Sequence, residues 1–417
     1  MRNNIRFDLS EYLIHFFRDV NLDSNNYILF PDHCGFNNLN YSLHLDARFL
    51  LRCSIRHHKI CSSWSIRGGA RTIYGNSPAV CLTEMPIPAF IKTSIDRIQR
   101  GENIGQYALV FPKNQMFAAG ARPVIYGLAN VDTNLPPSNG GGRERIIHPS
   151  LLALEEQFRY VTYNPSSQRP IDWTHEREWR WPCREGNNFD FSEQPDDLES
   201  YPGFDFSKVD LTGCGVIVPS SQDISRIIFD ILTLVDRRII MPHTFSFVLP
   251  MDRITSYTNI VNPTDLSICI NQNVINIGQY FELSESEINT LDYHIASIIE
   301  NESSNYTAKT KVRERGRAWV WIVDNQPDVT RALVSSQRIT VSKEGRYLLD
   351  LGWSNVMKDL RDQEEIAKRV ASKIAAEFNI NCSYFSVLNS SDINAVPFYT
   401  DFLDEAHEFY NVTKRVD

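Results

Sequence analysis

The chain has 417 residues, of which 42% are hydrophobic and 22% are charged, and its formal net charge is −9. This composition is ordinary for a globular protein, the length suits two or three domains, and the acidic balance excludes a general nucleic-acid coat. The eight cysteines are scattered without a Cys-x-x-Cys motif, and no apolar run approaches the roughly 18 residues of a membrane span. We therefore expect reduced thiols, a cytoplasmic location and no membrane partner.

The first part of the chain alternates between short helices and short strands. A helix is predicted over residues 8–20, where apolar residues recur at helical spacing, followed by a strand over 27–30 and a helix over 46–58. A glycine-rich, basic and hydroxyl-rich stretch, 62–75, then leads into a strand over 79–84.

The elements that follow are equally short. In chain order the pattern predicts a strand over 106–111, a helical turn over 113–117, a strand over 122–127, a helix and strand within 151–163, and a strand over 176–181. The glycine- and arginine-containing loop 134–145 is either a lid or target-binding loop, or a plain surface insertion.

We divide this α+β protein into an N-terminal domain and two further parts joined by linkers. The parts are the N-terminal domain (1–183), an acidic linker (184–211), a middle segment with a β-α-β unit and a helix (212–300), and a small α/β C-terminal domain (316–417). The β-α-β unit has no glycine fingerprint after its first strand, so it predicts packing and not a dinucleotide site. In the C-terminal domain, a four-residue recurrence of apolar residues predicts a helix over 361–378.

The stretch 172–181 concentrates carboxylates, arginines and tryptophans. Strict alternation from Glu176 onward predicts a half-buried strand with Glu176, Glu178 and Arg180 on one face. Trp179 and Trp181 lie on the opposite face and anchor the strand. The charged face either lines a cleft or forms an ordinary glutamate–arginine ladder in the sheet.

Several kinds of active site are not supported by the sequence. It contains no Gly-x-Ser-x-Gly elbow and no Walker-type phosphate loop, and its histidines do not match zinc-ligand spacing, so we expect no metal. A metal-dependent nuclease that uses the same carboxylates is the weakest alternative.

The residue types left after these exclusions suit a site that binds a dinucleotide and cleaves it at the nicotinamide ribose. They are arginines, hydroxyl side chains, tyrosines and a Glu-x-Glu pair. Arginine binds a pyrophosphate bidentately, hydroxyls hold the ribose, and an aromatic ring stacks on nicotinamide. One carboxylate stabilises the oxocarbenium-like charge that develops as nicotinamide leaves, and a second, two residues away, orients or deprotonates the acceptor.

Residues 61–180 resemble bacterial ADP-ribosyltransferase-like domains, most nearly the DarT-like and abortive-infection toxins. The features that carry the resemblance are two arginines, Arg67 and Arg71, ahead of the strand that ends in Thr83 and Glu84, the strand around Tyr126, and the later Glu176–Arg180 stretch. The resemblance implies a mixed-sheet fold and NAD as the substrate, with Glu178 as the catalytic residue and Glu176 as the auxiliary one.

The resemblance also implies a set of NAD-binding residues, which are Arg67, Arg71, Tyr74, Thr83, Glu84, Tyr126 and His44. Arg67 and Arg71 are alternatives for the single arginine of the family. The early Tyr-His-Phe-Thr motif of the family is absent, and His44 is its nearest counterpart.

We expect an NAD-dependent mono-ADP-ribosyltransferase that modifies a macromolecule, either nucleic acid or protein, in anti-phage defence or as a toxin with a cognate antitoxin or defence partner. The alternative is a non-catalytic, transferase-like antitoxin, sensor or scaffold that acts through its C-terminal domain. The whole chain also resembles an uncharacterised bacterial two-domain family, through its stretches 316–321 and 396–400.

Overall fold

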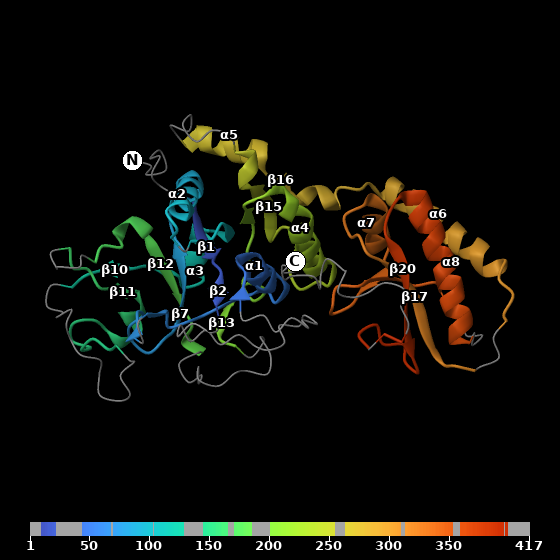
Figure 1. Cartoon of the computed structure of the whole chain (residues 1–417), viewed down its shortest axis with the longest axis horizontal. Coiled ribbons are helices and arrows are strands. Elements are labelled where there is room, and N and C mark those ends of the chain that lie inside the picture. The colour runs from blue at the N-terminus through green and yellow to red at the C-terminus, as the bar shows by residue number, and fades with distance from the viewer. Residues whose placement is uncertain are drawn as a thin grey trace. The chain divides into compact units, whose positions relative to one another are not determined.

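The computed structural model describes residues 10–21, 44–67, 70–102, 104–128, 145–165, 171–185, 201–254, 263–309, 313–352, 359–395 and 397–398. The predicted strand 27–30 and nearly all of the loop 134–145 lie outside the described residues. The described chain divides into two compact units, one formed by 10–224 and 243–276, the other by 225–242 and 277–398. Both mix helices with strands (Figure 1), as the α+β prediction requires. Within the described residues, no helix is long and apolar enough to cross a membrane.

An eight-stranded mixed sheet forms the centre of the first unit. Its strands, in spatial order, are β16 (Ile275–Asn276), β15 (Phe245–Pro250), β14 (Cys214–Val218), β8 (Tyr107–Pro112), β1 (Tyr12–Phe17), β7 (Ala79–Thr83), β12 (Glu178–Pro182) and β9 (Arg122–Pro123). Strands β14 and β15 run parallel, and the other neighbouring pairs run antiparallel.

The helix predicted over 8–20 is wrong, because the structure places strand β1 there. Strand β1 lies between β7 and β8 near the middle of the sheet, and the adjacent Leu13 and Ile14, which point to opposite faces, are both fully buried. A strand buried on both faces reads as a continuous apolar run, and such a run also satisfies helical spacing.

The helices of the first unit cover the faces of this sheet. Helix α1 (Ala47–Arg56) begins where predicted, because the Asp46 carboxylate accepts from the backbone N–H of Phe49 at 2.7 Å. Helix α2 (Ile87–Gln99) packs its buried Phe90 and Ile91 against Ile14 of β1 and Val110 of β8. Fully burying each of these side chains contributes about 1.5–3 kcal/mol.

Shorter elements complete the first unit. They are β2 (Val20–Asn21), β3 (His44–Leu45), β4 (Lys59–Cys61), β5 (Ile66–Arg67), β6 (Ala70–Arg71), α3 (Lys113–Ala118), β10 (Ile125–Tyr126), η2 (Leu154–Arg159), β11 (Tyr160–Val161), η3 (Thr174–Glu176), β13 (Gly203–Asp205), η5 (Ser221–Asp223), η6 (Met251–Arg253) and α5 (Pro263–Asn273). The predicted helix within 151–163 is thus a 3-10 helix followed by a two-residue strand.

The expected acidic linker 184–211 includes part of the first unit's core. Strand β13 pairs with β4, and the buried Phe204 and Phe206 pack on Phe111 with ring centroids 5.9 and 6.3 Å apart. These aromatic residues are spaced two apart within an acidic and proline-containing sequence, so its composition concealed a short strand.

The second unit contains a four-stranded antiparallel sheet. Its strands, in spatial order, are β18 (Ile339–Val341), β19 (Tyr347–Leu349), β17 (Gly316–Ile322) and β20 (Cys382–Leu388). Its helices are α4 (Ile224–Asp236), η7 (Ile277–Phe281), α6 (Glu285–Ser304), α7 (Asp328–Ser335) and α8 (Leu360–Phe378). Helices α6 and α8 lie on the same side of β17 and β20 (Figure 1).

The core between these helices and the sheet includes the apolar stripe predicted for α8, with Ile366, Val370 and Ile374 fully buried. The predicted β-α-β unit is present as β14, α4 and β15. Its helix, however, contributes Phe229 to the core of the second unit. Residues 225–242 therefore belong to the second unit, although the strands that precede and follow them in the chain, β14 and β15, belong to the first.

Candidate functional site

The chain makes a tight turn immediately before β12. Residues Thr174–Glu176 form the 3-10 helix η3, in which the N–H of Glu176 donates to the carbonyl oxygen of Trp173 at 3.0 Å. Arg177 then adopts a left-handed conformation, with φ +47°, and the strand begins at Glu178. The regular alternation predicted from Glu176 therefore starts two residues later, and Glu176 is held by the turn instead of the strand.

Glu178 lies at the start of β12, opposite Thr83 of β7 in the sheet register. Its Oε1 accepts from Nε of Arg180 at 2.7 Å, and its side chain is 19% exposed. Arg180 is buried, and its Nη1 donates to the carbonyl oxygens of Phe158 and Tyr160 at 2.7 and 3.2 Å. This arrangement matches the glutamate–arginine pairing that the sequence left open, while a part of the carboxylate stays accessible.

Cys81 lies beside the Glu178–Arg180 pair, because it is the register partner of Arg180 on β7. Burial is the largest cause, and the negative charge of Glu178 the next, that together raise the pKa of the Cys81 thiol to about 12. The thiol is therefore protonated at neutral pH and is not a nucleophile.

Glu176 has its own arginine, which the sequence did not point to. Nη1 of Arg97, in the last turn of α2, lies 2.8 Å from Oε1 of Glu176, and its Nε donates to Glu102 at 2.7 Å. The imidazole Nε2 of His175 is 3.6 Å from the same oxygen of Glu176. The carboxylate is 20% exposed, so it remains within reach of a ligand.

Thr83 and Tyr126 both contact this turn through their hydroxyls. Thr83 Oγ1 donates to the carbonyl oxygen of Glu176 at 2.5 Å, and Tyr126 Oη donates to that of Trp173 at 3.1 Å. The structure therefore brings together four of the predicted site residues, which are Glu176, Glu178, Thr83 and Tyr126.

Glu84 contacts the opposite face of β12. Its Oε2 accepts from the indole N–H of Trp179 at 2.8 Å, and its Oε1 lies 2.9 Å from Nζ of Lys113. Because Trp179 and Glu178 alternate along one strand, Glu84 lies across the sheet from the Glu178 carboxylate. Its contacts are those of a residue that anchors the tryptophan face.

The other predicted NAD-binding residues lie in or near the β5–β6 hairpin, apart from His44. The guanidinium of Arg71 lies 4.0 Å from the centre of the Trp64 ring, and the hydroxyl of Tyr74 is 3.0 Å from that of Thr162. The side chains of Arg67 and His44 lie outside the described residues, although their backbones pair in β5 and β3.

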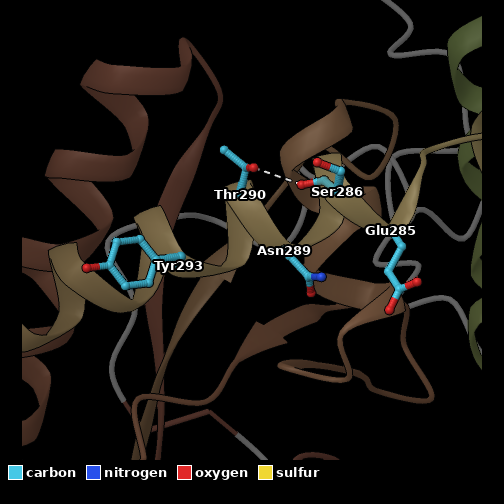
Figure 2. Close-up of a pocket in the computed structure, with 5 residues that line it drawn as sticks. All are labelled: Glu285, Ser286, Asn289, Thr290 and Tyr293. Carbon is cyan, nitrogen blue, oxygen red and sulfur yellow. Dashed lines mark hydrogen bonds between the residues drawn. The ribbon is translucent and has the colours of Figure 1, made fainter.

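Within the described residues, no group of three or more His, Cys, Asp or Glu side chains could hold a metal ion. A shallow hollow elsewhere, in the second unit, is lined by five residues of α6 (Figure 2), which are Glu285, Ser286, Asn289, Thr290 and Tyr293. All five belong to one helix, and the hydroxyl of Thr290 donates to the carbonyl oxygen of Ser286 within that helix at 2.8 Å. The hollow presents one carboxylate among neutral groups.

Comparison with known proteins concerns the second unit. A family model described as "Protein of unknown function (DUF4427)" matches residues 283–412. The matched segment begins just before α6 and contains none of the carboxylate-bearing turn. No curated protein and no solved structure matches the chain. The resemblance of residues 61–180 to ADP-ribosyltransferase-like domains stays a prediction.

Proposed function

We propose that the chain is an NAD-dependent mono-ADP-ribosyltransferase that modifies a macromolecular acceptor, with Glu178 acting at the nicotinamide ribose and Glu176 at the acceptor. One observation carries the proposal: two partly exposed carboxylates extend from a single braced turn at the start of β12, and each lies within 2.8 Å of an arginine nitrogen. Charge-assisted hydrogen bonds of this kind fix the orientation of each carboxylate.

The two carboxylates divide the chemistry between them. NAD supplies the glycosidic bond that breaks as nicotinamide leaves. An ionised Glu178 binds a ribose hydroxyl and stabilises the positive charge that develops on the ribose, in the way carboxylates act at other glycosidic bonds. The acceptor nucleophile forms a bond to the ribose carbon that nicotinamide leaves, and Glu176 accepts the proton that the nucleophile loses. Arg180 holds the carboxylate of Glu178 from the buried side, since the guanidinium also donates to two buried carbonyl oxygens.

The biological setting that fits this chemistry is a toxin or anti-phage effector. A macromolecular acceptor, nucleic acid or protein, approaches the exposed Trp173 and His175 that surround Glu176. A cognate antitoxin or defence partner restrains the activity in the cell.

The test is transfer of labelled ADP-ribose from NAD, or release of nicotinamide, by the purified full-length chain with cell extract, DNA, RNA or protein as acceptor. Glu178→Gln keeps an oxygen that can accept from Arg180, so it preserves the fold while it removes the negative charge. We expect a loss of at least about 100-fold in turnover, as for removal of one transition-state-stabilising group. Glu155→Gln, at an exposed carboxylate of η2, is the matched control and should retain full activity. No turnover with any acceptor, in the wild type, would overturn the proposal.

A second candidate is favoured by the same ion pairs. Arg180 and Arg97 engage the oxygens that a catalytic carboxylate would offer to its substrate. This is the arrangement of a non-catalytic, transferase-like antitoxin, sensor or scaffold that acts through its C-terminal part. In that case Glu178→Gln leaves the cellular phenotype intact. Tyr293→Ala, on the exposed face of α6, should instead weaken that phenotype.

A further inference from the structure

The turn that carries Glu176 and leads to Glu178 is conformationally demanding. Arg177 has a positive φ of 47° without being glycine, a backbone state that L-residues rarely adopt unless their surroundings hold them there. The turn therefore depends on contacts with neighbouring segments, and the distance between the two carboxylates depends on the turn.

A single hydroxyl holds both ends of this turn. Tyr126 Oη donates to the carbonyl oxygen of Trp173 at 3.1 Å and accepts from the backbone N–H of Glu178 at 3.3 Å. The residues it joins are five positions apart in the chain. Loss of the hydroxyl would release the first and last residues of the turn together.

Tyr126 is itself fixed by the backbone around it. Strand β10 pairs in parallel with β11, so that Tyr126 lies opposite Val161. The N–H of Val124 donates to the carbonyl oxygen of Glu178 at 3.1 Å, and the N–H of Gly127 donates to that of Val161 at 3.0 Å. The phenol is therefore held between the start of β12 and strand β11.

The phenol must be protonated to make both bonds, since it donates one and accepts the other. Burial is the main cause that raises the pKa of Tyr126 above its ordinary value, against the opposing effect of the hydrogen bond from the Glu178 backbone. The hydroxyl therefore keeps its proton at neutral pH.

We propose that Tyr126 is a positioning residue for the Glu176–Glu178 pair, acting through the backbone of the turn and not by contact with NAD. This inference rests on the proposed transferase activity and replaces the expectation that Tyr126 binds the dinucleotide. Thr83 braces the middle of the same turn, and the N–H of Glu84 donates to the carbonyl oxygen of Arg177 at 3.0 Å. Tyr126, by contrast, contacts both ends of the turn.

The kinetic test compares Tyr126→Phe with the wild type in the full-length chain. The variant keeps the ring and loses only the hydroxyl. We expect kcat for nicotinamide release to fall at least about ten-fold while KM for NAD changes less than two-fold. The lost hydroxyl bonds to the backbone that positions the two carboxylates and not to the substrate. Tyr107→Phe is the matched control, since its hydroxyl donates to Asp223 at 2.9 Å in another part of the same unit, and it should keep its kcat.

Backbone hydrogen exchange supplies a second measurement that needs no activity. In Tyr126→Phe the Glu178 amide loses its acceptor, so a peptide covering residues 173–180 should exchange at least about ten-fold faster, while Tyr107→Phe leaves that peptide unchanged. Unchanged exchange, or a rise in KM with constant kcat, would overturn the positioning role. If the wild type proves inactive while the exchange result holds, the transferase proposal fails and the bracing of the turn stands.

Discussion

Arg180 donates from Nε to Oε1 of Glu178 at 2.7 Å, although both residues lie on the same strand, two positions apart. The guanidinium also donates to two carbonyl oxygens, those of Phe158 and Tyr160. It thereby joins the start of β12 to the segment that runs from η2 into β11. One buried arginine supports both the electrostatics of the carboxylate and the attachment of its strand.

Replacing Arg180 with methionine should destabilise the first unit strongly. The change leaves a half-buried carboxylate and two buried carbonyl oxygens without their donor, and breaking such a pair from one side costs about 3–5 kcal/mol. Urea unfolding gives the free-energy difference. Lys92→Met removes an exposed partner of Asp96 on α2 and should change stability by less than about 0.5 kcal/mol. A loss below about 1 kcal/mol for Arg180→Met would mean that the network contributes little.

A second buried pair ties α4 to the rest of the second unit. Arg331 of α7 binds Asp236 with two bonds of 2.6 and 2.8 Å, and the two side chains are 4% and 2% exposed. The hydroxyl of Tyr347 donates to the same carboxylate at 2.7 Å. We expect Asp236→Ala to lower the free energy of unfolding by about 3–5 kcal/mol, since it leaves the arginine charge buried alone.

The control for Asp236→Ala is Asp350→Ala, which removes the more exposed partner of Arg317 in the same unit. That change should cost less than about 1 kcal/mol. Equal effects of the two substitutions, measured by urea unfolding, would contradict the importance assigned to burial.

The sequence predicted those elements whose signals are local. Asp46 caps α1, and Ser284 with Glu287 forms the capping box at the start of α6, so both helix starts could be read directly. The apolar recurrence of α8 is equally local. Strand β1 was mistaken for a helix because the deciding fact, its burial between β7 and β8, is a property of the sheet.

The candidate site was predicted only in part, for the same physical reason. Glu178, Thr83 and Tyr126 do converge, but Glu176 was assigned to the strand face because nothing in a Glu-Arg-Glu sequence marks the left-handed Arg177. Arg97 was missed entirely, since it lies 79 positions from Glu176 in the chain and its segment carries no motif. A contact of that kind depends on how α2 packs on the sheet, and no short-range pattern encodes it.

The matched family segment should not fold as an isolated fragment. Residues 283–412 exclude α4, whose Phe229 packs in the core of the second unit with its ring 5.8 Å from that of Tyr347. A fragment of residues 277–417 therefore lacks both this aromatic contact and Asp236. We expect it to show no cooperative unfolding transition, whereas Phe229→Ala in the full chain should cost about 3–5 kcal/mol and leave a cooperative transition. A fragment that unfolds cooperatively would show that α4 is dispensable.

His15 should make the protein sensitive to mild acid. Burial is the main cause that lowers the pKa of His15 to about 4, although its Nδ1–H donates to the Cys81 carbonyl oxygen at 2.8 Å. An unfolded histidine has a pKa of about 6.5, so the folded-state value is depressed. Stability is then fully present above about pH 6.5 and is lost as the pH falls toward 4. The full shift corresponds to about 3 kcal/mol, of which about 2 kcal/mol is lost by pH 4.5, because this pH still lies above the folded-state pKa.

Urea unfolding of the wild type and of a His15 variant, each at pH 7.5 and pH 4.5, measures this loss. The carboxylates of the protein contribute equally to both chains, so the difference between the chains reports on His15. His15→Asn keeps a donor for the Cys81 carbonyl oxygen but cannot take up a proton, so its stability should fall by about 2 kcal/mol less than that of the wild type over this interval. The exposed His148 provides the control, since His148→Asn should reproduce the wild-type difference. If His15→Asn loses as much stability as the wild type, protonation of His15 does not destabilise the sheet.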